Sequence, residues 1–444
     1  MPGAIAAGHP LTALAGGRVL EDGGSAVDAL LAAAFTAFVT EGPLTGPTGG
    51  GFILVHAPHG ETTLLDCFFG VPTRGLGEME EVVIDFGDSG TQVFHVGAGS
   101  VAVPGLLAGL EEAHRRFATR AWADLVQPAI ELAREGFARD DARTFLHRIL
   151  GPILLREETG RRIYGDPRRV HTEEACATLE RIRDVGSAAV AELLPEYADD
   201  LRSYRVASPP PLETVALGRV IHSTPAPSLG GAVVERVLDL LAAAGEPSLE
   251  DTARALADAY GPHGSGPLPG TTHISVMDAS GTAAALSSTL GSGSGIFRSG
   301  TQLNNMLGEL DVIGTHEKRP GERLASMMTP TLVLEGDRPR LVIGSAGSVR
   351  LAGAIALVTW KFLTGVHVAD AIRAPRLHVE GTVLHLEGGW DDAAVAALPP
   401  SWEVVRWEGI NLFFGGVQAV ERRGDGTYQA AGDPRRGGVG LVVR

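Results

Sequence analysis

A Gly- and Pro-rich stretch at residues 261–270 constrains the fold most, because the periodicity of the chain changes there. Before it, from Pro104 to about Tyr260, apolar residues recur mostly at helical spacing. After it, short apolar and β-branched runs alternate with glycine-containing turns, a pattern typical of strands. The sequence therefore predicts a helix-rich part that ends near residue 270 and a strand-rich part that follows.

Individual helices and strands can be predicted on both sides of this boundary. The first part begins with two helices within residues 9–40, the second of them an Ala-rich helix over 26–39 with Ser25 as N-cap. The other predicted helices cover 105–116, 121–135, 173–184, 231–244, 350–363 and 367–373. The predicted strands lie near 52–56, 62–69, 272–278, 283–290, 330–335, 340–344, 382–387, 402–407, 416–422 and 427–431.

Composition excludes several classes of partner for this chain of 444 residues. A net charge of −16 without a basic stripe argues against nucleic acid. The only two cysteines, Cys67 and Cys176, form neither a metal-ligand pattern nor a disulfide framework. The N-terminus lacks a basic leader, and no apolar run is long enough to span a bilayer. We expect a cytoplasmic protein with no membrane partner, metal or other cofactor.

Two threonines, Thr271 and Thr272, follow the linker and begin a strand-like run. A hydroxyl at this boundary can attack the carbonyl of Gly270, which would make Thr271 a new N-terminus. The freed α-amine, which titrates near pH ~7.7–8.0, could then serve as the base for that hydroxyl. Two β-branched residues also begin many ordinary strands after a turn. From these residues alone the ordinary strand start is favoured.

Two other segments could bring polar groups to Thr271. If a turn at 278–281 joins the strands 272–278 and 283–290, Thr271 faces Ser288, and Thr289 lies within one residue of it. A second turn, at 344–348, lies between an apolar strand and a helix, and its N–H groups could form an oxyanion hole. A tight turn with a serine N-cap explains the same residues.

Nine blocks, taken in order and spacing, make the chain resemble the γ-glutamyltransferase family of N-terminal nucleophile hydrolases from His9 almost to the C-terminus. The blocks are His9-Pro10 followed by Gly23-Gly24-Ser25-Ala26-Val27-Asp28-Ala29, Gly46-Pro47-Thr48-Gly49-Gly50-Gly51-Phe52, Val103-Pro104-Gly105, Thr224-Pro225-Ala226-Pro227-Ser228-Leu229-Gly230-Gly231, Thr271-Thr272-His273-Ile274-Ser275-Val276, Leu303-Asn304-Asn305, Met328-Thr329-Pro330-Thr331, Gly344-Ser345-Ala346-Gly347-Ser348-Val349-Arg350 and Ala374-Pro375-Arg376.

This resemblance implies an α+β fold, a four-layer αββα sandwich. It implies cleavage between Gly270 and Thr271 into a large chain, 1–270, and a small chain, 271–444, which stay associated as one intertwined catalytic domain. Thr271 would be the nucleophile in processing and turnover, with Thr289 as its hydrogen-bonding partner. The backbone at Gly347 and Ser348 would form the oxyanion hole. His273 would take a structural role in its strand.

The substrate contacts depart from the family pattern, above all at Phe68. Family members that act on glutathione carry Arg-Glu-Thr-Ala-Pro where this chain has Phe68-Phe69-Gly70-Val71-Pro72. Phe68 thus replaces the arginine that clamps the glutamyl α-carboxylate, and a phenyl ring cannot make that bidentate, charge-assisted contact.

Other polar contacts of the family have changed in the same direction. Gly291, Met306 and Met327 stand where an asparagine, a glutamine and a serine are expected. Glu309, in place of an aspartate, and Ser326 keep something of the amino and carboxylate contacts. Arg74 and Arg298 are hypothetical replacements for the lost cation.

Three functional hypotheses follow. The first is a self-processing amide hydrolase or acyltransferase that takes an acyl group onto Thr271 and passes it to water or an amine, with γ-glutamyl compounds as the leading small-molecule substrates. The second is an acylase for a bulkier, less charged acyl group, such as a β-lactam side chain. The third is a catalytically silent, unprocessed binding protein. The acceptor and the oligomeric state stay open, and a homo-oligomer is compatible with the sequence.

Overall fold

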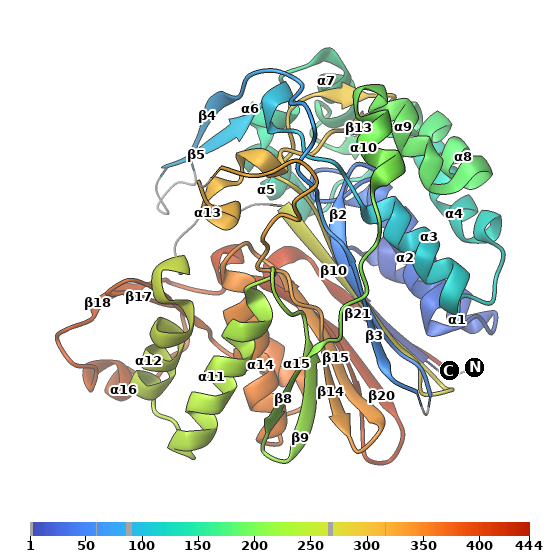
Figure 1. The fold of residues 1–444 in the computed structure, drawn as a ribbon. Helices are drawn as coiled ribbons and strands as arrows, with labels where there is room; N and C mark the ends of the chain where they lie inside the picture. Colours follow the sequence, from blue (N-terminus) through green and yellow to red (C-terminus); the bar gives the residue numbers. More distant parts are fainter. Residues whose placement is uncertain (1–2, 59, 86–90, 265–269, 316) are drawn as a thin grey trace.

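Two six-stranded sheets lie face to face between two layers of helices in the computed structural model (Figure 1). The structure describes residues 3–58, 60–85, 91–264, 270–315 and 317–444. In Figure 1 the layers run from helices α1 and α2 on the right, through the two sheets, to helices α11 and α14 at the lower left. The predicted four-layer αββα sandwich, an α+β fold, is confirmed.

All neighbouring strands within each large sheet are antiparallel. The first sheet has the order β21 (Val439–Val443), β1 (Gly3–Ala7), β10 (Gly270–Asp278), β11 (Ala283–Gly291), β2 (Gly50–His56) and β3 (Thr62–Cys67). The second has the order β20 (Tyr428–Gly432), β19 (Gly416–Arg422), β15 (Arg338–Ala346), β14 (Thr331–Glu335), β9 (Arg219–Ser223) and β8 (Leu212–Ala216).

Helices cover the outer face of each sheet. On the first sheet these are α1 (Pro10–Glu21), α2 (Ala26–Thr40) and α3 (Leu106–Phe117). Farther out, α4 (Trp122–Glu135) packs on α2, and α8 (Cys176–Val185) packs on α4. Those on the second are α11 (Gly230–Ala244), α12 (Leu249–Tyr260), α14 (Arg350–Leu363) and α15 (Val368–Arg373). Smaller elements used below are α5 (Asp141–Ile149), β4 (Glu80–Asp85), β5 (Thr91–Val96), β12 (Phe297–Arg298), β16 (Leu377–Glu380), β17 (Val383–Leu386) and β18 (Glu403–Arg406).

Both large sheets combine strands from before and after residue 270. In the first, β10 and β11 lie between β1 and β2, and in the second β14 pairs with β9. Neither part of the chain can therefore complete either sheet alone. Chains formed by cleavage at residue 270 would be held together by backbone hydrogen bonds and a shared core.

A buried histidine connects the two sheets just beyond the start of β10. His273 contacts the hydroxyls of Ser287 (2.8 Å) and Ser275 (2.9 Å), and Ser275 donates to the carbonyl of Gln418 in the second sheet. A β-carbon at Gly344 would lie 2.2 Å from the imidazole ring, so glycine is required there. Burial lowers the pKa of His273 to about 3, which keeps the ring neutral. These contacts agree with the structural role predicted for His273.

Most of the predicted elements are confirmed, with ends shifted by a few residues. The hairpin of β2 and β3, the helices α2, α3, α4, α11, α14 and α15, and the strands β10, β11, β14, β15, β17, β18, β19 and β20 all form where expected. The Ser25 N-cap is also confirmed, because its hydroxyl accepts from the amide of Asp28 at 3.1 Å.

Several stretches depart from the prediction, among them the unpredicted strands β4, β5, β16 and β21. Residues 212–223 were expected within a mostly helical region but form the hairpin β8–β9, because buried and exposed residues alternate in Leu212–Ala216 and Gly218 has a positive φ in the turn. Strand β1 was not predicted. It is buried on both faces and made mainly of alanine, so it shows no alternation.

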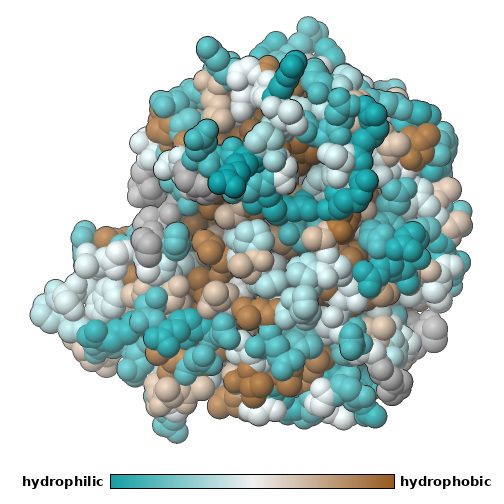
Figure 2. Space-filling model, in the orientation of Figure 1, coloured by the Kyte–Doolittle hydropathy of each residue, from teal (hydrophilic) through white to brown (hydrophobic). Residues whose placement is uncertain are grey.

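The face seen in Figure 2 is mostly hydrophilic or neutral, and hydrophobic surface gathers near its lower edge, over β8 and β9. Exposed apolar residues of that hairpin include Val215 and Leu217. Within the part of the chain that the structure describes, no helix combines the length and the hydropathy needed to cross a membrane.

Asp28 at the start of α2 joins three segments and gives a testable stability effect. Its carboxylate accepts from the amide and hydroxyl of Ser25, the amide and hydroxyl of Thr119 and the amide of Arg120. Burial opposes ionisation, but the hydrogen bonds, led by that from the Thr119 hydroxyl, outweigh it and lower the pKa of Asp28 below its ordinary value of 3.8.

Replacing Asp28 with asparagine is expected to lower the free energy of unfolding by about 2 kcal/mol at pH 7, since charge-assisted hydrogen bonds are lost. Because the folded-state pKa of Asp28 is depressed, its stabilisation is present above pH 3.8 and is lost as the pH falls through the folded-state value. Urea titrations of wild type and Asp28→Asn at pH 7 and pH 3 check this. Asp239→Asn, on an exposed face of α11, is the control. The expectation would be contradicted if the difference in free energy of unfolding between wild type and Asp28→Asn were the same at pH 7 and pH 3.

Candidate active site

Thr271 lies at an irregular point of the first sheet, near the start of β10. Gly270 pairs with Gly291 and Thr272 pairs with Ser288, so one extra residue of β11 bulges opposite Thr271. The prediction that Thr271 faces Ser288 is wrong by one residue. The reason is the turn, in which the amide of Asp278 donates to the carbonyl of Thr282, leaving three loop residues instead of two. Thr271 is 3% exposed.

The bulge directs Thr289 toward the peptide bond that precedes Thr271. The Thr289 hydroxyl donates to the carbonyl oxygen of Gly270, and the same hydroxyl accepts from the amide of Gly291 at 2.8 Å. Gly270 and Thr271 both belong to β10, so the structure describes the chain with this bond intact. In this state Thr289 contacts the carbonyl that would be attacked, whereas the sequence predicted a contact with the attacking hydroxyl.

The turn between β15 and α14 presents unpaired backbone amides. Gly347 has φ +130° and Ser348 has φ +57°, a left-handed conformation that is uncommon for serine. Among the hydrogen bonds of the described residues, none is donated by the amide of Gly347 or Ser348. The Ser348 hydroxyl is buried and also lacks a partner within the described chain. Such a turn has the donors that an oxyanion hole requires.

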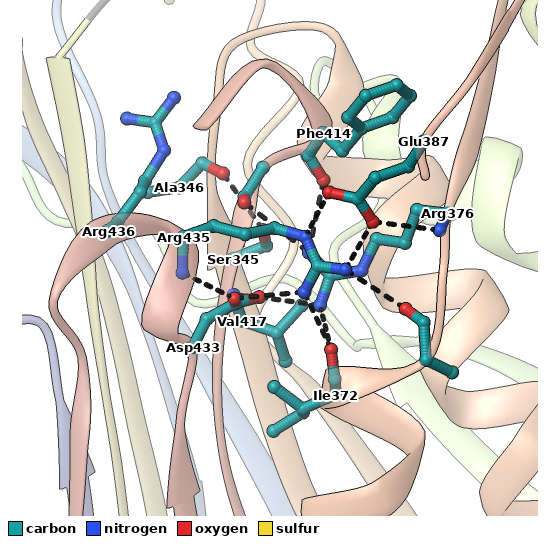
Figure 3. A network of polar contacts seen from close by, with 12 residues as sticks. Ser345, Ala346, Ile372, Arg376, Glu387, Phe414, Val417, Asp433, Arg435 and Arg436 are labelled. Carbon is teal, nitrogen blue, oxygen red and sulfur yellow. Dashed lines mark hydrogen bonds and ion pairs between the residues drawn. The ribbon is translucent and has the colours of Figure 1, made fainter. Parts of the chain in front are cut away.

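A buried ionic network lies beneath this turn (Figure 3). Asp433 accepts from Arg376 at 2.5 Å, from Arg435 at 3.1 Å and from the amide of Val417 at 3.0 Å. Glu387 pairs with the other side of the Arg435 guanidinium. Burial opposes ionisation of Asp433, but Arg376 and Arg435 outweigh it and lower its pKa. The network fixes the start of β19, which pairs with the end of β15 just before the turn.

Six of the sequence-predicted site residues line one small cavity, called here the Phe68 cavity: Phe68, Thr271, Thr289, Glu309, Ser326 and Ser348. The remaining lining is mainly apolar and consists of Gly291, Met306, Val312, Met327, Met328 and Leu351. The structure thus brings together segments from five regions of the sequence around Thr271.

Phe68 is fixed as part of the wall of this cavity. Its ring stacks on Phe52 with centroids 5.4 Å apart and meets Phe69 edge to face. The backbone carbonyl of Phe68 accepts from Arg323 at 2.6 Å, but Arg323 does not line the cavity. The cavity therefore presents an aromatic ring where a glutamyl clamp would place a guanidinium.

Glu309 is the one acidic residue among those that line the Phe68 cavity. One carboxylate oxygen accepts from the amide and hydroxyl of Ser292, each at 2.9 Å. The other oxygen, Oε2, is buried without a hydrogen-bond partner among the described residues. Burial raises the pKa of Glu309, against the opposing effect of these hydrogen bonds. Oε2 is available to a donor group on a ligand.

The remaining predicted substrate residues differ in location. Ser326 lies at the cavity, and its hydroxyl accepts from the amide of Met328 at 3.0 Å. Arg74 is exposed, and neither it nor Arg298 lines the Phe68 cavity. Arg298, on β12, pairs with Glu196 at 2.7 Å instead. The structure therefore does not bring either arginine to Thr271.

A second small cavity also has Thr271 in its lining and is called here the Arg143 cavity. Its charged lining comprises Glu41, Arg143, Arg435 and Arg436, none of which was singled out from the sequence. A charged residue on a helix ordinarily indicates a solvent-exposed face, so Arg143 on α5 gave no signal. Among the described residues no group of three His, Cys, Asp or Glu side chains could hold a metal ion.

The fold and the arrangement around Thr271 define the class of N-terminal nucleophile hydrolases. A hydroxyl at the start of a central strand, a donor on the preceding carbonyl and unpaired amides nearby suit both self-cleavage and acyl transfer.

Comparison with known proteins identifies the family within this class. The family described as Gamma-glutamyltranspeptidase matches residues 12–190 and 249–443. The chain belongs to this family and is a self-processing amide hydrolase or acyltransferase. It is 28% identical over 541 residues to the glutathione hydrolase proenzyme of Pseudomonas aeruginosa, covering 100% of this chain and 95% of that protein.

Relatives named as acylases are equally similar. The acylase ACY 1 proenzyme of Pseudomonas sp. (strain SE83) is 27% identical over 532 residues, covering 99% of this chain and 93% of that protein. The crystal structure of cephalosporin acylase from Bacillus halodurans superposes with a TM-score of 0.81 at 19% identity, covering 99% of this chain and 95% of the other. That structure supports the fold.

Proposed function

We propose that Thr271 takes up an apolar acyl group that carries no carboxylate, and that the Phe68 cavity holds this group during hydrolysis or transfer. The Thr271 hydroxyl attacks the amide carbonyl, the amine leaves with a proton, and water or a second amine resolves the ester. The free α-amine of Thr271 would serve as base, Gly347 and Ser348 would stabilise the oxyanion, and Thr289 would orient the reacting groups.

The observation that carries this proposal is the composition of the Phe68 cavity. No arginine or lysine is among its lining residues, and six of them are Phe68, Met306, Val312, Met327, Met328 and Leu351. A carboxylate transferred into such a site would lose its hydration without gaining a cation, which costs several kcal/mol. An apolar acyl group gains from the same transfer.

A γ-glutamyl group is the second candidate. Glu309 and Ser326 favour it, because Oε2 of Glu309 could accept from the α-amine of such a substrate. The relative named glutathione hydrolase supports the same choice, and the relative named acylase supports the first. The two candidates differ in whether a carboxylate on the acyl group is tolerated.

Four 4-nitroanilides separate the effect of an amine on the acyl group from the effect of a carboxylate. Their acyl groups are phenylacetyl, with neither group, phenylalanyl, with the amine, glutaryl, with the carboxylate, and γ-glutamyl, with both. We expect kcat/KM to be at least about tenfold higher for the better of the first two than for either carboxylate-bearing anilide, because burying an unpaired carboxylate is unfavourable. Release of nitroaniline measures the rates, and Thr271→Ala gives the background. Higher kcat/KM for γ-glutamyl than for both apolar anilides would overturn the apolar assignment and favour the second candidate.

A further inference from the structure

We propose that the Arg143 cavity is the subsite for the amine component of the amide, and that it recognises a carboxylate on an otherwise apolar or aromatic amine. This inference rests on the proposed function, since it assigns the acyl group to the Phe68 cavity. It assigns the arginines of the Arg143 cavity to recognition of the leaving or accepting amine.

Thr271 lines both cavities. The Phe68 cavity includes Thr289, Ser348 and the apolar wall that suits an acyl group, whereas the Arg143 cavity includes Gly8, Glu41 and residues of α5. If the acyl part of an amide attacked by Thr271 occupies the Phe68 cavity, the amine part needs a second space beside Thr271. The Arg143 cavity is therefore available for the amine.

Arg143 is a buried cation with unused hydrogen-bonding capacity. Its side chain is 2% exposed, and one terminal nitrogen donates to the carbonyls of Gly8 (2.7 Å) and Arg436 (3.1 Å). Its Nε is buried and has no hydrogen-bond partner in the described chain. Its one ion-pair partner in the described chain is Asp140, whose carboxylate lies 3.9 Å from Nε and is 39% exposed. A single partly exposed carboxylate at this distance compensates the buried charge only in part.

Arg436 places a second guanidinium at the same cavity. One of its nitrogens donates to the carbonyl of Leu412 at 3.2 Å, and its buried Nε has no partner among the described residues. In Figure 3 its side chain points away from the network of Asp433 and Arg435. Burial, followed by repulsion from Arg350, lowers the pKa of Arg436 to about 10, and repulsion from Arg143 adds to this. Two neighbouring cations with free donors form a site that an anion would complete.

Glu41 is not the missing anion. Its carboxyl oxygens accept from Thr272 at 2.6 Å and from Thr12 at 3.1 Å, and no ion pair joins it to either arginine in the described part of the chain. Burial raises the pKa of Glu41, against the opposing effects of the Arg143 charge and of these two hydrogen bonds. The Glu41 carboxyl group is thus engaged by two threonine hydroxyls, and no ion pair with it occupies the free Nε donors of the two arginines.

The rest of the Arg143 cavity selects the body of the ligand. Its walls include the apolar side chains of Leu44, Phe145, Leu146 and Leu412. A carboxylate held by the two arginines would leave the remainder of the ligand against these side chains. An aromatic or aliphatic amine with one carboxylate, such as an aminobenzoate or an apolar amino acid, matches both features.

Calorimetric titration of the full protein tests this subsite with two probes of the same shape. 3-Aminobenzoate carries the carboxylate, and 3-aminobenzamide replaces it with a neutral amide. We expect wild type to bind 3-aminobenzoate at least about tenfold more tightly than 3-aminobenzamide. Arg436→Leu should abolish this preference, and Arg143→Leu should do the same if its circular dichroism spectrum is that of wild type. Arg148→Leu, an exposed arginine on the same helix α5, should keep it.

The subsite assignment is overturned if wild type shows no preference for the carboxylate, or if Arg436→Leu keeps it. It is also overturned if 3-aminobenzoate binds to wild type no more tightly than to Arg436→Leu, in a wild-type preparation that turns over one of the anilides. The proposed function is tested separately, by anilide turnover. If no anilide is turned over, the proposed function is contradicted, and the binding of the two probes can still be measured. Loss of probe preference with normal anilide turnover would reject the subsite and retain the acyl assignment.

Discussion

Replacing Thr289 with valine is expected to slow cleavage between Gly270 and Thr271 at least about a hundredfold. Valine keeps the shape of threonine but cannot donate to the carbonyl of Gly270, which Thr289 contacts in the intact chain. Loss of one donor to a developing oxyanion typically costs about 10²–10³ in rate. The measurement is a time course of chain cleavage on denaturing gels after rapid purification.

Two matched variants make this result specific. Thr289→Ser keeps the hydroxyl and should retain most of the cleavage rate. Thr282→Val, in the turn at the other end of the same hairpin, should cleave like wild type. Equal cleavage rates for Thr289→Val and wild type would show that the contact with the Gly270 carbonyl does not contribute to processing.

Replacing Thr271 with alanine is expected to abolish both cleavage and amide turnover. Alanine removes the attacking hydroxyl while keeping a small side chain at a site that is 3% exposed. Removal of a catalytic nucleophile typically lowers kcat by about 10⁶-fold, so the anilide signal should fall at least about 10⁴-fold. Thr271→Ser should still cleave, more slowly, because it keeps a hydroxyl.

The parts of the site that could be predicted from the sequence are those set by local spacing. The linker, the two threonines and the hairpin that follows lie within about 30 residues of each other, so the proximity of Thr289 to residue 271 could be derived from strand register. The turn at Gly347 and Ser348 was visible as glycine and serine between a strand and a helix. The resemblance to a family then supplied the roles.

The parts that could not be predicted depend on contacts between distant segments. Arg143 comes from a helix whose amphipathic pattern was not recognised, and Arg436 comes from the C-terminal region, yet the two line one cavity. Arg298 looked available as a cation, but its partner Glu196 lies 102 residues away. Sequence spacing does not report which way a single charged side chain points. The cytoplasmic location and a homo-oligomer stay predictions.

The intact mass of the purified wild-type chain tests the central claim most directly, with Thr271→Ala measured beside it. Self-cleavage predicts two wild-type species whose masses match residues 1–270 and 271–444, and a single full-length species for Thr271→Ala. A wild-type chain that remains a single species of 444 residues would contradict the account and favour an unprocessed binding protein.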